Sequence, residues 1–323
     1  MTPAAHLTRE RSLVDLKTLM SIRNLELRAR AVVEGFWAGA HRSPYHGFSV
    51  EFTEYRPYTP GDDLRYLDWR VLARSDRFFL KRFEDETNVR CHLIVDQSRS
   101  MTYGSAGYTK AEYAATLAAT LALFLHMQGD AIGLVTFDDR VRDYLPPKHR
   151  SSHLREVMTT LEKPATGAAT DLAAPLQNIV DIVRKRGLLV VISDFLAPVG
   201  PLENALTQLS ACGHGIIVFQ VLDPTEVSFD FNDSAIFEDV ESGRSLLVDP
   251  AAVRGEYTRK LEEHCAAISN ACQRLGNNYS RLLTNQPLEF ALFDFLRARE
   301  QRGKANRRFA RQRGAQGPVT RAS

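Results

Sequence analysis

The strongest constraint on the fold is a short apolar run, residues 89–96, which ends in an aspartate and precedes two serines at alternate positions. A run of this length before turn-forming residues predicts a buried parallel strand. In open α/β sheets, ligands bind outside the carboxyl ends of such strands. We therefore expect Asp96, Ser98 and Ser100 to share one loop at a sheet edge, where a carboxylate and two hydroxyls suit a hard cation such as Mg²⁺.

The remaining chain alternates between strand and helix patterns. Apolar, often β-branched runs predict further strands at residues 131–137, 188–193, 215–222 and 279–284. The stretch after the first of these pairs most simply with it as an antiparallel hairpin. Thr109 and Glu112 form a capping-box pattern that begins a helix ending at Met127. This alternation predicts an α/β fold with a doubly wound, mostly parallel sheet of Rossmann-like topology.

Further segments flank this α/β part. Residues 1–88 combine leucines at helical spacing with two strand-like stretches, so we expect an N-terminal helical and β-rich extension ahead of an α/β domain at 89–300. Within the extension, Asp62–Trp69 suits either a turn braced by internal ion pairs or a docking surface. Residues 301–323 carry seven basic residues and no acidic residue, and we expect a disordered, solvated tail.

The composition is that of a soluble globular protein, 44% hydrophobic and 25% charged. The net charge of the whole chain is +2, and the tail contributes seven positive charges. Residues 1–300 are therefore mildly acidic and give no sign of a broad nucleic-acid surface. The four cysteines form no C-x-x-C pair, which favours buried thiols in a reducing compartment. The N-terminus lacks a signal-peptide pattern, and the most apolar helix candidate, Tyr113–Met127, is too short to span a membrane. We therefore expect a cytoplasmic protein with no membrane span and no nucleic-acid partner.

Two further loops offer oxygen donors. A small-residue loop presents Thr170, and the strand predicted at 188–193 is followed by Asp194. If the strands are neighbours, these side chains join the loop after residue 96 in a set of two carboxylates and three hydroxyls. Such a set suits the oxygen coordination of Mg²⁺, and its lack of histidine and cysteine argues against zinc.

The motifs DQSRSM, GAATDL and ISDF resemble the metal-ion-dependent adhesion site of von Willebrand factor A domains. The resemblance covers about residues 89–300 and implies a von Willebrand A-like fold. It also implies a Mg²⁺ or Mn²⁺ site with three direct ligands, Ser98, Ser100 and Thr170. Asp96 and Asp194 would then act mostly through water.

The upstream segment, FTEYRPYTPGDDLRYLDWRVLARSDRFFLKRFEDE, resembles a narrower family, catalogued only as domain of unknown function fifty-eight. Members of that family often sit beside MoxR-type AAA+ ATPases. The resemblance therefore implies an ATPase of this type as a partner.

The favoured function is non-enzymatic. Neutral hydroxyls and water-mediated carboxylates neutralise a divalent ion only partly, so an open coordination position attracts a carboxylate from another protein. We expect a metal-dependent adaptor that binds a client protein through an acidic residue of the client and hands it to a MoxR-type ATPase for maturation or assembly. Arg99, between the two serines, either meets an acidic partner or points to solvent. In the plainest alternative, Asp96 merely caps a loop.

A magnesium-dependent hydrolase acting on phosphate esters is the alternative function, with Asp96 as nucleophile or metal ligand. No general acid or base is evident nearby, and a D-x-D pair is absent because Gln97 and Ser98 fill those places. His92 lies four residues before Asp96, and we expect it to be buried and hydrogen-bonded within the sheet. The basic tail holds one aromatic residue, Phe309, so it is poorly suited to stacking on nucleic acid.

Overall fold

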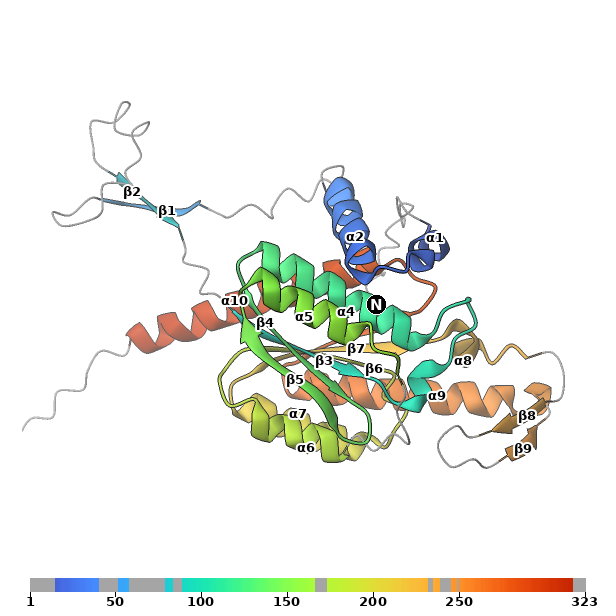
Figure 1. Ribbon diagram of the computed structural model, residues 1–323. Coiled ribbons are helices and arrows are strands. Elements are labelled where there is room, and N and C mark those ends of the chain that lie inside the picture. Colours follow the sequence, from blue (N-terminus) through green and yellow to red (C-terminus); the bar gives the residue numbers. More distant parts are fainter. Residues whose placement is uncertain are drawn as a thin grey trace, which may run out of the picture. The chain divides into compact units, whose positions relative to one another are not determined.

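A computed structural model describes residues 15–40, 52–57, 79–83, 89–165, 173–231, 235–238, 245–248 and 250–315 (Figure 1). The helices are α1 (Leu16–Ser21), α2 (Leu25–Ala40), α4 (Lys110–Met127), α5 (Ser151–Leu161), α6 (Ala173–Ile182), α7 (Val199–Ala211), α8 (Pro224–Ser228), α9 (Pro250–Arg274) and α10 (Leu288–Ala315), with a 3₁₀ turn η2 (Arg99–Thr102). The strands are β1 (Phe52–Pro57), β2 (Phe79–Phe83), β3 (Arg90–Asp96), β4 (Ala131–Phe137), β5 (Val141–Lys148), β6 (Leu188–Ser193), β7 (Gly215–Leu222), β8 (Ala235–Glu238), β9 (Ser245–Val248) and β10 (Asn278–Leu283).

The larger of two compact units is built on a six-stranded sheet of order β10-β7-β6-β3-β4-β5. Neighbouring strands are parallel except β5, which pairs antiparallel with β4. From β3 the chain adds β4 and β5 on one side, then returns to add β6, β7 and β10 on the other. The strand order therefore reverses between β3 and β6, which is where doubly wound sheets form ligand sites. The predicted α/β class and the antiparallel hairpin are confirmed.

Helices cover both faces of this sheet (Figure 1). On one face lie α6, α7 and α9, where Ile94, Val191 and Val218 of adjacent strands join Leu206 and Ile268 in one buried apolar cluster. The other face carries α4, α5 and α10. Every residue of β6 and β7 is buried, which explains why these strands are almost continuously apolar, apart from Ser193 and Gln220, rather than alternating in pattern.

The helix α4 begins where the sequence predicts. Thr109 and Glu112 form a complete capping box, because each accepts a hydrogen bond from the other's backbone N–H through its side chain. Lys110 is therefore the first residue of the helix, and its side chain is 0% exposed. Because the helix begins at this point, the charged side chain of Lys110 is buried in the interior.

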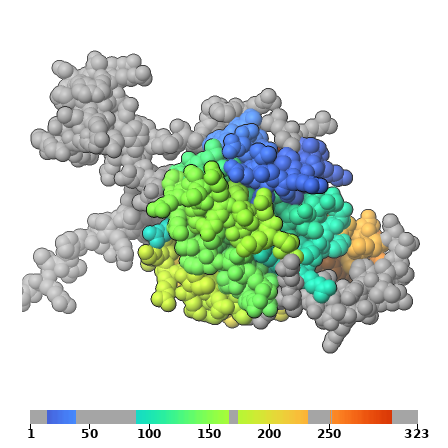
Figure 2. Space-filling model, viewed as in Figure 1, coloured from blue at the N-terminus to red at the C-terminus, as the bar shows by residue number. Residues whose placement is uncertain are grey.

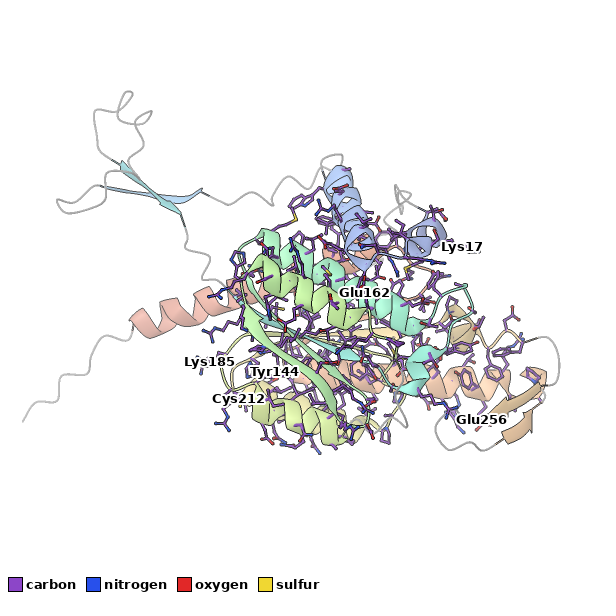
Figure 3. The ribbon with its side chains drawn as sticks, in the orientation of Figure 1. Lys17, Tyr144, Glu162, Lys185, Cys212 and Glu256 are labelled. Atoms are coloured by element: carbon purple, nitrogen blue, oxygen red, sulfur yellow. The ribbon has the colours of Figure 1, made fainter. Side chains whose placement is uncertain are left out.

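The N-terminal helices pack on the helices of the sheet, so α1 and most of α2 fall in the larger compact unit together with the residues after Asn88. Arg28 of α2 donates from Nη1 to the hydroxyl of Thr116 in α4 (2.9 Å). Leu25 donates its N–H to the carboxylate of Glu162, just beyond α5 (3.1 Å). Figure 3 labels Glu162. In Figure 2 the two blue helices lie directly against the green surface of α4 and α5. The helices α1 and α2 join this unit because their apolar side is buried there.

The smaller unit, Trp37–Asn88, contains an antiparallel ribbon. β1 pairs with β2, and Phe52 lies opposite Phe83 at one end of the ribbon. These are the two strands expected in the β-rich segment. Asp62–Trp69 lies outside the described residues, and the choice between a braced turn and a docking surface stays a prediction.

The helix α10 continues to Ala315, so the tail expected to be disordered from Gln301 is helical over its first part. Arg, Lys, Gln and Ala dominate residues 301–315, and all four have high helix propensity. Within the described part of the chain, every helix is too short or too polar to cross a bilayer.

All four cysteines are free. Cys91, Cys265 and Cys272 are buried as expected, whereas Cys212 is exposed at the C-terminal end of α7.

His92 on β3 departs from its expected environment. It is 2% exposed, yet neither ring nitrogen has a hydrogen-bond partner among the described residues. The expectation of a hydrogen-bonded histidine is wrong, because the neighbours across the sheet, Gly133 and Leu189, offer no polar side chain. Burial, reinforced by His214 and Arg90, lowers the pKa of His92 to about 4. The ring is therefore neutral near pH 7.

Candidate metal centre

The carboxylate of Asp96 is completely buried at the carboxyl end of β3. Its Oδ1 accepts the N–H of Ser98 (2.8 Å), and its Oδ2 accepts the hydroxyl of Ser193 (2.5 Å), the last residue of the neighbouring strand β6. Burial and the nearby charge of Asp194 raise the pKa of Asp96 to about 7, against the opposing effect of these hydrogen bonds. One carboxylate thus joins the two strand ends at the point where the sheet order reverses.

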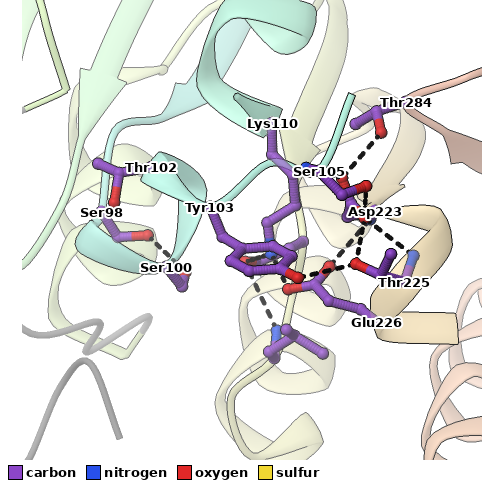
Figure 4. Close-up of polar contacts among 12 residues, drawn as sticks. Ser98, Ser100, Thr102, Tyr103, Ser105, Lys110, Asp223, Thr225, Glu226 and Thr284 are labelled. Atoms are coloured by element: carbon purple, nitrogen blue, oxygen red, sulfur yellow. Dashed lines mark hydrogen bonds and ion pairs between the residues drawn. The ribbon is translucent and has the colours of Figure 1, made fainter. Parts of the chain in front are cut away.

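Two hydroxyls follow Asp96 in the same loop. The Oγ atoms of Ser98 and Ser100 lie 3.1 Å apart, next to the 3₁₀ turn that begins at Arg99 (Figure 4). This separation allows one hydroxyl to donate to the other. It also matches the edge of an oxygen octahedron around Mg²⁺, about 3 Å for ligands at about 2.1 Å. The spacing of the two hydroxyls therefore fits the ion that the sequence predicts.

The second carboxylate, that of Asp194, follows β6 directly and is completely buried. It follows a strand that pairs parallel with β3, and its charge contributes to the raised pKa of Asp96. In Asp194, Oδ2 accepts a hydrogen bond from the ammonium of Lys110 (2.8 Å), and Oδ1 accepts one from the N–H of Leu196 (3.3 Å). Phe195 takes a left-handed backbone conformation (φ +52°), which turns the chain immediately after the carboxylate.

Four of the five predicted ligands can thus be placed, and all four lie at the carboxyl ends of β3 and β6. The fifth, Thr170, lies outside the described residues. Among the residues that are described, no three side chains of His, Cys, Asp or Glu gather closely enough to hold a metal ion. An ion at these strand ends would therefore depend on hydroxyl oxygens and water as well as on carboxylates.

Sequence reasoning missed a buried lysine, Lys110, at this site. Besides Asp194, Nζ of Lys110 binds Oε1 of Glu226 in α8 (2.6 Å; Figure 4). Burial disfavours the ammonium, but the two carboxylates outweigh burial, and the pKa of Lys110 is raised. A lysine at the start of a helix reads as a surface residue, so nothing in the sequence marks it as buried. The run DPTE, residues 223–226, did carry a signal, because it forms a capping box for α8.

A third buried carboxylate fixes the loop between η2 and α4. Asp223, after β7, accepts hydrogen bonds from the N–H and the hydroxyl of Ser105 (2.9 and 2.6 Å) and from the same two groups of Thr225 (2.9 and 2.6 Å). The hydroxyl of Tyr103 also contacts the hydroxyl of Thr225 (2.8 Å; Figure 4). Burial alone would raise the pKa of Asp223, but these hydrogen bonds outweigh it and lower that pKa. The loop after the two serines is thereby tied to β7.

We expect Asp223→Asn to lower the free energy of unfolding by about 1–3 kcal/mol at pH 7, because an amide cannot accept all of these hydrogen bonds. Since folding lowers the pKa of Asp223, its contribution is present above the ordinary pKa of 3.8 and is lost as the pH falls below it. Urea denaturation at pH 7 and pH 3 measures both effects. Asp181→Asn, at an exposed position of α6, is the control. An equal loss of stability at the two pH values would contradict this role.

A cavity of about 710 Å³ adjoins the loop that carries the predicted ligands. Asp96 and Gln97 line it together with the first turn of α4, the end of α5 and the turn between α1 and α2. Both basic and acidic side chains take part, among them Arg23 and Glu162. The N-terminal helices therefore add a wall beside the candidate site.

Comparison with known sequences gives matches over most of the chain. Residues 54–267 match the family model described as "Protein of unknown function DUF58". Among curated proteins, "Uncharacterized protein Rv1480" of Mycobacterium tuberculosis is 29% identical over 278 residues, which are 84% of this chain and 86% of that protein.

Solved structures of similar fold include the conserved hypothetical protein BatB from Bacteroides thetaiotaomicron. It is 16% identical, with a TM-score of 0.47, over 66% of this chain and 99% of that one. The VWA domain of SpRpn10 is 12% identical, with a TM-score of 0.39, over 64% of this chain and 94% of that one.

Proposed function

This chain belongs to the family described as "Protein of unknown function DUF58", and we propose that it is a non-enzymatic, metal-dependent protein-binding adaptor. In this proposal Mg²⁺ or Mn²⁺ binds at the carboxyl ends of β3 and β6. A client protein supplies an acidic residue to the ion. A MoxR-type AAA+ ATPase then acts on the client in chaperone-like maturation or assembly, a partner that rests on the family resemblance alone.

The observation that carries the proposal is the contrast between the hydroxyls and the carboxylates of the site. Ser98 and Ser100 offer neutral oxygens at octahedral spacing. Both oxygens of Asp96, and both of Asp194, already accept hydrogen bonds from the chain. An ion held by the hydroxyls would keep much of its charge and would attract a further carboxylate oxygen, the ligand that hard cations prefer. An Asp or Glu of another protein is the natural source.

Direct titration with Mn²⁺ tests the site first. We expect the wild-type chain to bind one Mn²⁺, and we expect Asp96→Ala and the gentler Ser100→Ala to abolish or strongly weaken this binding. Asp181→Ala, an exposed aspartate of α6, should bind Mn²⁺ as the wild type does. Wild-type affinity in both site variants would reject the ion site.

Capture of client proteins tests the adaptor role. The immobilised wild-type chain should recover a client from lysate together with the ATPase, and EDTA or Ser100→Ala should remove the client. The recovered client should lose its binding when its own acidic residues at the contact are replaced. Equal recovery with and without EDTA would reject metal-gated binding.

The position of Asp96 does not support the hydrolase alternative. A nucleophile must reach its substrate, but this carboxylate is completely buried and both of its oxygens are engaged. Magnesium-dependent turnover of a generic phosphatase substrate, abolished by Asp96→Asn, would favour the hydrolase over the adaptor.

A further inference from the structure

Lys110 forms a buried ion pair with Asp194, one of the predicted ligands of the metal site. We propose that Lys110 is a positioning residue of that site, which holds Asp194 out of direct contact with the ion and thereby keeps a coordination position open for the partner's carboxylate. This inference rests on the proposed function and adds to it the device that keeps the site incomplete.

The contacts of Lys110 leave Asp194 little freedom. Nζ lies 2.8 Å from Oδ2 of Asp194 and 2.6 Å from Oε1 of Glu226, and the side chains of Lys110 and Asp194 are both 0% exposed. The Oδ1 atom of Asp194 accepts the N–H of Leu196, and its backbone carbonyl accepts the side-chain amide of Gln220 (2.9 Å). For Asp194 to bind an ion directly, its carboxylate would have to leave a buried ammonium. Such a step is costly where both side chains are fully buried.

The charge of Lys110 acts in the same direction. A fixed ammonium next to Asp194 offsets the negative charge that would otherwise draw a divalent cation to this carboxylate. Glu226 sits on the far side of the ammonium and balances part of its charge. The affinity of the isolated chain for an ion should therefore depend on both residues, and in opposite directions.

Two variants separate these effects. In Lys110→Met/Glu226→Gln, Asp194 loses its counter-ion and becomes available to the ion, while no carboxylate is left at position 226 without a partner. In Glu226→Gln alone, the ammonium stays on Asp194 and its charge is no longer balanced. The matched control is Arg299→Met/Asp130→Asn, which removes another mostly buried ion pair (2.6 Å). Asp130 precedes β4 and so lies at the opposite edge of the sheet from the predicted ligands.

The experiment is a titration of each full-length variant with Mn²⁺ alone. Electron paramagnetic resonance measures the concentration of free Mn²⁺ and hence the affinity, and water-proton relaxation reports the number of waters on the bound ion. We expect the Lys110→Met/Glu226→Gln variant to bind Mn²⁺ about ten-fold or more tightly than the wild type, as one added carboxylate ligand provides. Relaxation should show fewer waters on the bound ion, because Asp194 replaces one. Glu226→Gln should bind several-fold more weakly, and the control should match the wild type.

The outcomes separate this inference from the proposed function. If the wild type binds no Mn²⁺, the proposed function fails and the role of Lys110 fails with it. If the wild type binds Mn²⁺ but neither variant changes the affinity, or the double variant binds more weakly, the ion site stands and the role of Lys110 is overturned. Should the double variant not fold, Glu226→Gln carries the test by itself, and unchanged affinity in it overturns the proposal.

Discussion

Lys110→Met should destabilise this chain by about 3–5 kcal/mol, because removing one partner of a buried ion pair leaves uncompensated charge in the interior. Asp194 is completely buried, and the side chain of Glu226 is 16% exposed. Without the ammonium, the two carboxylates lie close together with no cation between them, and Asp194 has no exposed surface through which water could stabilise its charge. Methionine keeps most of the length of lysine, so the loss reports the charge rather than the packing.

Urea denaturation at pH 7 measures this effect. Adding Glu226→Gln should restore a large part of the stability, because it removes one of the two stranded charges. The control is Lys260→Met, which breaks an exposed ion pair with Glu256 on α9 (2.7 Å) and should change the stability little, because water screens both charges. If Lys110→Met cost no more than this control, the enclosed ion pair described here would be wrong.

His92→Leu should stabilise the chain, and the gain should grow as the pH falls. At pH 7.5 we expect a gain of about 1 kcal/mol, because two buried ring nitrogens without partners are removed. The folded chain holds the pKa of His92 at about 4, whereas the ordinary value is 6.5. Between these two pH values His92 is protonated in the unfolded chain but neutral in the folded chain, so the wild type loses stability as the pH falls. At 1.36 kcal/mol per pKa unit, this loss reaches about 3 kcal/mol.

Denaturation of wild type and His92→Leu at pH 7.5 and pH 4.5 separates the two contributions. The difference between the two proteins isolates the contribution of His92 together with its interaction with His214 and Arg90. Thr207→Leu, which places a leucine at an exposed position of α7 without removing an ionisable group, is the control and should give the same difference from the wild type at both pH values. A gain of the same size at both pH values would show that His92 does not carry the pH dependence.

Most of the fold follows from local patterns. The strands β4, β6 and β7 lie where apolar runs predict them, because a strand covered on both faces needs apolar side chains throughout. The start of α4 follows from the Thr109–Glu112 capping box. The packing of α1 and α2 on α4 was not predictable in this way, because helical spacing shows that a helix has an apolar side but not which surface buries it.

Part of the candidate site could be predicted from the sequence. Asp96, Ser98, Ser100 and Asp194 could be predicted together, because parallel strands bring their carboxyl ends to one edge and the residues after them are polar. Lys110 and Glu226 were missed. They are 84 and 32 residues from Asp194 in the sequence, and a buried ion pair between such residues leaves no periodic pattern to detect. His92 was placed in the sheet correctly but given partners that it lacks.

The sequence by itself determined the strands, the capping of α4 and the presence of oxygen donors after β3 and β6, because each depends on residues close together in the chain. The tertiary structure alone decided which charges meet. Whether a carboxylate faces a hydroxyl, a backbone N–H or an ammonium depends on how strands and helices from distant parts of the chain pack, and in a buried site that choice sets which ligands remain available to an ion.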